Sequence, residues 1–251
     1  MEFPKRPFRT HGGAAVPQHK NTWAIPTATM PPPEKIILPM QQHIGAPCVP
    51  TVKKGDHVFV GTIVGDNDAY VCAPVHSSVS GTVTEITSVM LTGGQMTQAV
   101  VIESDGKMEH DPNIAPPTAI TSKEELAAAA RSAGLVGLGG AGFPAHVKLN
   151  VPEGKTIDTL IVNVAECEPY VTSDHREALE NGRNVLDGIY KVKDILSVQR
   201  VIIAVENNKP DVIEKLTEIA DDPKRDPLDQ VRVLPLKSRY PQGAEKVLVQ
   251  A

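Results

Sequence analysis

The sequence lacks the features that mark membrane-spanning, secreted and nucleic-acid-binding proteins. Its 251 residues contain no run of eighteen apolar residues, and the amino terminus MEFPKRPFRTHGG has no apolar core of signal-peptide length. The 25 Lys and Arg residues against 30 Asp and Glu residues give a net charge of −5, with no sustained basic run that would bind a phosphate backbone. We therefore expect a cytoplasmic protein with no membrane span of its own and no nucleic-acid partner.

Cysteine is also scarce. Cys48, Cys72 and Cys167 are odd in number and far apart in sequence, which matches neither a disulfide framework nor the Cys-x-x-Cys spacing of metal ligands. No Ser-His-Asp or Cys-His set for nucleophilic catalysis is apparent, and the carboxylates beside Cys167 should raise its thiol pKa and make it a poor nucleophile. The sequence thus predicts no metal site and no catalytic residue, and we expect Cys48 and Cys72 to be small buried hydrophobes.

The chain divides into three regions by composition. Residues 1–33 are rich in proline and read as an extended arm. Residues 34–115 contain short β-branched runs separated by turn residues, which predicts an all-β module. Residues 116–251 begin with a Ser-x-x-Glu capping box at Ser122 and then alternate helical and strand patterns, which predicts an α/β domain.

The β module resembles a lipoyl- or biotinyl-carrier fold, that is, a small barrel-sandwich. VKKGDHVFVG at 52–61 and SGTV at 80–83 resemble the two halves of such a fold. The attachment lysine of a carrier is missing, because the corresponding connection, residues 66–69, reads Asp-Asn-Asp-Ala. We therefore expect a structural or docking module rather than a carrier.

Three buried strands are predicted in the second half, at 158–164, 200–206 and 230–236. Helices are predicted between them, at about 173–196 and from Asn208 onward. Such alternation builds a parallel sheet with right-handed crossovers, so we expect a Rossmann-like α/β domain. Ligands of such sheets bind beyond the carboxyl ends of the strands.

A glycine-rich segment, GLVGLGGAGFPAHVK at 134–148, precedes the first of these strands. Its backbone N–H groups can face a phosphate, or its bare main chain can lie against a flat ring, with Lys148 adding a positive charge. The spacing is neither the dinucleotide fingerprint nor a Walker loop. Two interpretations stay open, a ligand cradle and a tight structural connection. The candidate binding residues are Gly137, Gly139, Gly140, Gly142 and Lys148.

Polar residues also follow the first strand and precede the end of the chain. Asn163, Glu166 and Glu168 lie in one loop, and in an extended chain the two carboxylates would point to the same side and accept hydrogen bonds from ribose hydroxyls or an amide. The alternative is a solvated acidic loop. Gly243 and Glu245 lie in a second segment, YPQGAEK, whose alternative interpretation is a surface turn that opens a final helix.

Four motifs occur together in a specific order: GLGGAGFPAHVKL at 137–149, NVAECEPYVTSDHR at 163–176, VENNKP at 205–210 and YPQGAEK at 240–246. With QQHIGAP at 41–47, they resemble the C subunit of the Rnf electron-transport complex, collinearly from Ile36 onward. That family is similar to the flavin-bearing, NADH-oxidising subunit of respiratory complex I.

The resemblance implies an electron-transfer subunit that passes electrons between NADH and iron–sulfur centres through bound flavin mononucleotide (FMN). Its glycine loop would contact the flavin phosphate and ribityl chain through Gly137, Gly139, Gly140 and Lys148. The resemblance further implies that Asn163, Glu166 and Glu168 lie near the flavin ring or the NADH, and that Gly243 and Glu245 close the pocket.

The resemblance also implies partners and a place in the cell. The partners would be the other membrane and soluble subunits of an ion-translocating complex, with a ferredoxin-type electron partner, and the protein would lie on the cytoplasmic face of the membrane. Members of the family continue into a region with two Cys-x-x-Cys-x-x-Cys clusters for [4Fe–4S] centres. We therefore expect a truncated chain, with an incomplete flavin pocket and no activity alone. Alternatives are a soluble flavin reductase, such as a cobalamin reductase of propanediol utilisation, and a non-catalytic docking fragment.

Overall fold

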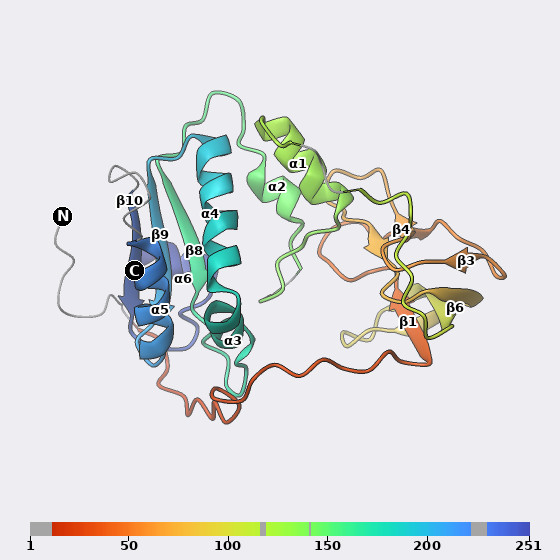
Figure 1. Ribbon diagram of the computed structural model, residues 1–251, viewed down its shortest axis with the longest axis horizontal. Helices are drawn as coiled ribbons and strands as arrows, with labels where there is room; N and C mark the ends of the chain where they lie inside the picture. Colours follow the sequence, from red (N-terminus) through yellow and green to blue (C-terminus); the bar gives the residue numbers. More distant parts are fainter. Residues whose placement is uncertain (1–11, 116–118, 141, 222–229) are drawn as a thin grey trace. The chain divides into compact units, whose positions relative to one another are not determined.

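The computed structural model describes residues 12–115, 119–140, 142–221 and 230–251, which fall into two compact units (Figure 1). One unit comprises residues 29–153, and the other comprises residues 12–28 together with 154–251. No helix in the described part of the chain is both long and apolar enough to cross a membrane.

Unit 29–153 is built mainly from two small antiparallel sheets. The first has the order β1-β7-β6-β3, with β1 at Lys35–Pro39, β7 at Met96–Ser104, β6 at Gly81–Met90 and β3 at His57–Val58. The second has the order β2-β4-β5, with β2 at Val49–Pro50, β4 at Ile63–Asp66 and β5 at Val75–His76. Residues 34–115 contain these strands and no helix, so the all-β pattern predicted for that range is confirmed.

The core of this unit is apolar and contains two of the three cysteines. Cys48 and Cys72 are 4% and 0% exposed and pack with Met40, Val64 and Ile102, so the expectation of buried cysteines is confirmed. Burial, and next the neighbouring Cys72, raises the pKa of the Cys48 thiol to about 12. The Cys48 thiol therefore stays protonated near neutral pH.

Helices α1, at Lys123–Ser132, and α2, at Ala145–Leu149, belong to this same unit. The predicted capping box is present, with the Ser122 side chain accepting from Glu125 N and the Glu125 carboxylate accepting from Ser122 N. We expected the α/β domain to begin at residue 116, whereas the division by contacts lies between Glu153 and Gly154. One physical reason is the bidentate ion pair of Arg131 on α1 with Asp66 on β4, at 2.8 Å.

The second unit contains a three-stranded parallel sheet of order β10-β9-β8. Strand β8 is Thr159–Val164, β9 is Arg200–Glu206 and β10 is Gln230–Leu236, all within one residue of the predicted ranges. The parallel register, Val164 to Val205 and Val205 to Pro235, places the carboxyl ends of all three strands at one edge.

Helices cover both faces of this sheet. Helices α3 at Ser173–Glu180, α4 at Gly182–Leu196 and α5 at Pro210–Ala220 enclose the larger core, and α6 at Glu245–Gln250 packs through Leu248 on the other face (Figure 1). Strand β9 supplies both cores because its side chains alternate, with Ile203 in the first and Ala204 in the second. The helix expected at 173–196 is two helices, interrupted at Asn181.

Residues 12–28, predicted as part of an extended arm, are bound to this α/β unit. Ala14 pairs with Tyr240 through two backbone hydrogen bonds of 2.8 and 2.9 Å. Further along, Thr27 N donates to the Glu180 carboxylate at 3.0 Å. Residues 1–11 of the predicted arm lie outside the described residues.

Candidate functional site

The glycine segment forms a closed loop on unit 29–153. Its two sides are joined where Gly137 N donates to Phe143 O at 2.9 Å and Ala145 N donates to Leu135 O at 2.8 Å. The tip between them is solvent-facing, since Leu138 is 93% exposed. The loop thus presents bare backbone from a hydrogen-bonded base that leads directly into α2.

The glycines of this loop serve different purposes. A Cβ added at Gly139 or Gly140 would meet no atom within 4 Å, and neither residue has a positive φ. Gly142 has a φ of +65°, and an added Cβ would lie 2.8 Å from Gln42 O. Gly142 is therefore required by the fold, whereas Gly139 and Gly140 are required by nothing within the described chain. Ala141 lies outside the described residues.

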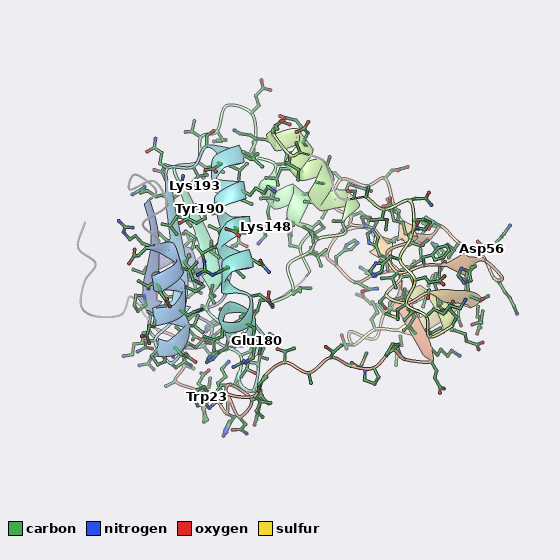
Figure 2. The ribbon with its side chains drawn as sticks, in the orientation of Figure 1. Trp23, Asp56, Lys148, Glu180, Tyr190 and Lys193 are labelled. Carbon is green, nitrogen blue, oxygen red and sulfur yellow. The ribbon has the colours of Figure 1, made fainter. Side chains whose placement is uncertain are left out.

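Lys148 lies on α2, close to this loop (Figure 2). Its Nζ atom lies 5.7 Å from the centre of the Phe143 ring, and the side chain is exposed. A cation this close to an aromatic face is attracted to it weakly, and Lys148 also makes interactions of its own. The arrangement suits the positive charge predicted beside the glycines.

The second candidate set lies at the carboxyl edge of the parallel sheet. Asn163, near the end of β8, donates from Nδ2 to Gly243 O at 2.8 Å and accepts from Ala165 N at 3.1 Å. An added Cβ at Gly243 would lie 2.2 Å from Ala165 O, so only glycine allows this approach of the two segments. The structure thus brings Asn163 and Gly243 together, although they are 80 residues apart in sequence.

Glu166 and Glu168 have different environments. Glu166 is 2% exposed, and its Oε1 accepts from Asp174 N at 2.8 Å, in the first turn of α3. Its Oε2 lies 3.7 Å from Lys20 Nζ and has no hydrogen-bond partner among the described residues. Glu168 is exposed. The same-side orientation that an extended chain would give the two carboxylates does not follow here, because the chain leaves β-geometry after Val164. Their role toward a ligand stays a prediction.

Two lysines hold this loop, the partly buried Lys20 and the buried Lys209, and sequence reasoning missed both contacts. Lys20 donates to three backbone carbonyls of the loop, those of Glu166, Glu168 and Val171, at 2.6–2.8 Å. Burial, and next the charge of Lys209, lowers the pKa of Lys20. The sequence places Lys20 in the arm, but the carbonyl groups that it contacts are about 150 positions away, so no local pattern predicts these contacts.

Lys209 is 1% exposed and pairs with Glu206 at 2.8 Å. This pair is buried and bridges the end of β9 to the start of α5. The spacing i, i+3 across a strand end was the available signal.

Several buried polar atoms of this unit lack a hydrogen-bond partner among the described residues. They include both amide atoms of Gln242, which is 1% exposed, and Oε1 of Glu206. Glu245, in the first turn of α6, makes its own interactions and is not free. Unpartnered buried polar groups are costly unless a ligand or water meets them.

Cys167 is held between these groups and is not a nucleophile. Its Sγ accepts from Gly243 N at 3.3 Å, and it is 1% exposed. The predicted rise of the Cys167 thiol pKa is confirmed in direction, and burial rather than the neighbouring carboxylates is its main cause.

Two family models match the chain, one on each side of residue 115. Residues 8–107 match the RnfC barrel sandwich hybrid domain. Residues 130–251 match the Nuo51 FMN-binding domain of complex I. These matches divide the chain near the predicted boundary, although the contacts divide it later.

Similar curated proteins cover nearly the whole chain. The C subunit of a proton-translocating ferredoxin:NAD(+) oxidoreductase complex of Clostridium ljungdahlii is 42% identical over 92% of this chain and 50% of its own length. The C subunit of a Na(+)-translocating ferredoxin:NAD(+) oxidoreductase complex of Acetobacterium woodii is 41% identical over 96% of this chain and 54% of its own length. The C subunit of an ion-translocating oxidoreductase complex of Rhodobacter capsulatus is 37% identical over 98% of this chain and 47% of its own length.

The chain thus spans about half the length of the curated relatives it matches. Both halves of the chain match a family model, and the relatives are named as the same component of such a complex from one organism to the next. The chain belongs to the RnfC family, the C subunits of Rnf-type ion-translocating oxidoreductase complexes.

Proposed function

We propose that the protein is the electron-transfer part of an NADH–ferredoxin oxidoreductase that is coupled to ion translocation. Electrons would pass between NADH and iron–sulfur centres through bound FMN. The observation that carries the proposal is the match of residues 130–251 to an FMN-binding domain, in a chain whose glycine loop has open space at Gly139 and Gly140.

The glycine loop suits the phosphate and ribityl chain of FMN. Open space at Gly139 and Gly140 leaves backbone N–H groups accessible, and Lys148 adds a nearby positive charge. Backbone N–H groups in a loop that leads into a helix bind phosphate without any side chain. Gly137 and Gly142 shape the loop, Gly137 through its bond to Phe143 and Gly142 through its positive φ.

The strand-edge residues suit a polar ring system or a nicotinamide. The three-stranded parallel sheet supports a Rossmann-like assignment, in which ligands bind beyond the strand ends. Asn163 and Gly243 shape the edge, while the unpartnered oxygen of Glu166 and the exposed Glu168 are acceptors for ribose hydroxyls or an amide. Glu245 would lie at the margin of this strand edge.

FMN, when bound, supplies hydride acceptance and the conversion of two-electron to one-electron transfer, so the chain itself needs no general base. The residues described above would bind the flavin and orient it. The relatives' names imply a complex with further subunits, and we propose such subunits and a ferredoxin-type protein as partners. A peripheral position on the cytoplasmic face of the membrane and [4Fe–4S] centres outside residues 1–251 belong to the same proposal.

The test is a titration of the purified chain with FMN, followed by quenching of flavin fluorescence. A matched titration uses a longer chain, of the full length of the relatives, of which this chain spans about half. Binding to either chain, weakened by Lys148→Ala, is the expected result. If neither chain binds FMN, the flavoprotein assignment is wrong, and the docking-fragment alternative gains support.

NADH oxidation by the flavin-loaded longer chain separates the remaining alternatives. Electron delivery to a ferredoxin supports the proposed complex. Delivery to a cobalamin with none to ferredoxin would instead support a soluble reductase.

A further inference from the structure

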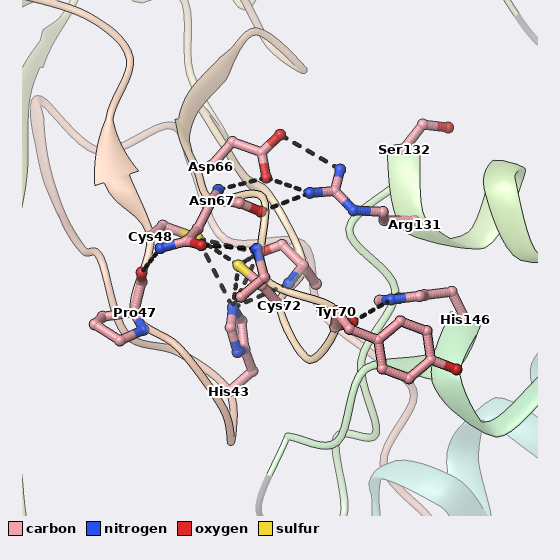
Figure 3. Close-up of polar contacts among 12 residues, drawn as sticks. His43, Pro47, Cys48, Asp66, Asn67, Tyr70, Cys72, Arg131, Ser132 and His146 are labelled. Carbon is pink, nitrogen blue, oxygen red and sulfur yellow. Dashed lines mark hydrogen bonds and ion pairs between the residues drawn. The ribbon is translucent and has the colours of Figure 1, made fainter.

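Three buried side chains with metal-binding atoms converge within unit 29–153, and none of them belongs to either candidate set described above. They are His43, Cys48 and Cys72, which are 6%, 4% and 0% exposed (Figure 3). Their ligand atoms all lie within 4.8 Å of one another. The spacing of the cysteines gave no hint of this cluster, because successive members are 5 and 24 positions apart in sequence.

The distances among the three atoms are nearly equal. Cys48 Sγ lies 3.6 Å from Cys72 Sγ and 3.8 Å from His43 Nε2, and Cys72 Sγ lies 3.7 Å from the same nitrogen. Zinc bonds of about 2.3 Å to sulfur and about 2.0 Å to nitrogen, at tetrahedral angles, place ligand atoms about 3.5–3.8 Å apart. The three atoms thus form one face of a tetrahedron of the right size.

The ring of His43 can bind a metal through Nε2. With the ring proton on Nδ1, that nitrogen donates to Ile44 O at 3.0 Å and leaves the lone pair on Nε2, where a bound metal would replace the hydrogen bond from Ala73 N at 3.2 Å. A metal-binding histidine commonly donates its other N–H to a backbone carbonyl in this way, which fixes both the tautomer and the ring orientation.

A fourth ligand position is also available. Ala73 O lies 3.0 Å from His43 Nε2, 3.2 Å from Cys48 Sγ and 4.0 Å from Cys72 Sγ. An unprotonated Nε2 cannot donate to this oxygen, so a cation between the two acceptors would relieve their contact. A cavity of about 340 Å³ is lined by His43, Ala73 and other residues of this unit.

The backbone around the cluster is fixed before any metal binds. Ala46 N donates to Val71 O at 3.1 Å, and an added Cβ at Gly45 would lie 2.1 Å from that same oxygen. Cys48 N donates to Met40 O at 2.8 Å. The loop that carries His43 and Cys48 is therefore bound to the segment that carries Cys72, and metal binding needs little rearrangement.

The charges also balance. Two thiolates and a neutral imidazole around a divalent cation have a net charge of zero, which suits a site where all three side chains are buried. Soft sulfur with imidazole in a tetrahedral set favours zinc over magnesium or calcium, which prefer oxygen ligands. We propose that His43, Cys48 and Cys72 form a structural zinc site, with the fourth position filled by Ala73 O or by a water molecule.

The first test is a cobalt titration of the chelator-treated, reduced chain. We expect one equivalent of Co²⁺ to bind with thiolate-to-cobalt charge-transfer absorption and tetrahedral ligand-field bands, and zinc to displace it. Cys48→Ser and Cys72→Ser should each weaken binding by more than about 100-fold, beyond the loss typical of an outer-shell change. Cys167→Ser is the matched control, because it removes a buried cysteine of the other unit, and it should bind cobalt unchanged.

A second measurement does not depend on the folding of any variant. X-ray absorption of the zinc-loaded wild-type chain should show two sulfur ligands together with lighter atoms. Absence of cobalt binding by the reduced chain, a zinc shell without sulfur, or a Cys48–Cys72 disulfide in freshly purified protein would each overturn the proposal. None of these readouts involves FMN, so the zinc site and the proposed function fail or stand independently.

Discussion

At the scale of single residues, the glycines of the loop separate into Gly142, which the fold needs, and Gly139 and Gly140, which we propose that FMN needs. We expect Gly139→Val to leave stability unchanged, because the added side chain meets no atom of the described chain. It should weaken FMN binding at least about tenfold, about 1.4 kcal/mol, by occupying the space against the backbone.

Gly93→Val is the matched control for this variant. Gly93 also has open space around it and no positive φ, and it lies in the turn between β6 and β7. The assignment of Gly139 fails if titration shows equal FMN affinity for Gly139→Val and Gly93→Val.

Gly243 is the opposite case. A Cβ there would lie 2.2 Å from Ala165 O, and this oxygen belongs to the backbone and cannot turn away. We expect Gly243→Ala to lower the free energy of unfolding by about 2–3 kcal/mol, as overpacking does. Urea denaturation measures the effect, and Gly188→Ala, at an open position on α4, is the control. Equal midpoints for both variants would contradict the close approach.

The buried pair of Lys209 and Glu206 should show strong coupling. Lys209→Met leaves the Glu206 carboxylate buried without its cation, and we expect a loss of about 3–5 kcal/mol in unfolding free energy. Adding Glu206→Gln should restore part of this loss, because the uncompensated charge is then removed. Denaturation of the single and double variants measures the coupling, and strictly additive losses would contradict it.

At the scale of elements, residues 12–28 are attached to the α/β unit at a few points, of which Lys20 is the best connected. We expect Lys20→Met to lower stability by about 1–3 kcal/mol, because three carbonyls of residues 166–171 lose a charged donor. Hydrogen exchange should accelerate at Tyr170 N, which donates to Gln18 O at 2.8 Å.

Lys191→Met, at an exposed position on α4, is the control for this variant. Unchanged exchange at Tyr170 in Lys20→Met would show that residues 12–28 are held without this lysine.

At the scale of the whole molecule, exposed carboxylates make stability depend on acid pH. Hydrogen bonds and nearby cations lower the pKa of five carboxyl groups in the described residues: Asp105, Asp111, Glu125, Asp158 and Glu180. Each pKa is lower in the folded chain than in the unfolded chain. Their contribution is therefore present above the unfolded value of about 4, and it is lost as the pH falls through the folded values.

Partial desolvation, and next the charge of Glu166, raises the pKa of Asp174, which offsets a part of this effect. We expect the urea concentration at the unfolding midpoint to decrease as the pH is lowered from 6 to 3. A midpoint that increases as the pH is lowered would contradict the balance of five lowered pKa values against one raised value.

The sequence by itself determined the local structure of this protein and its family. Short apolar runs predicted strands 200–206 and 230–236 with the bounds that are observed, and a capping box predicted the start of α1. Such signals are local, because they depend on neighbours a few residues apart. The motifs that carry the glycine loop and the strand-edge residues likewise lie within short segments.

Only the tertiary structure decided which distant residues meet. It brought Lys20 to the 166–171 loop, Asn163 to Gly243, and His43 with Cys48 to Cys72. It also left Glu168 exposed while it buried Glu166, because the chain turns after β8. Contacts across such separations depend on how sheets and loops pack together, and no local pattern in the sequence records that packing.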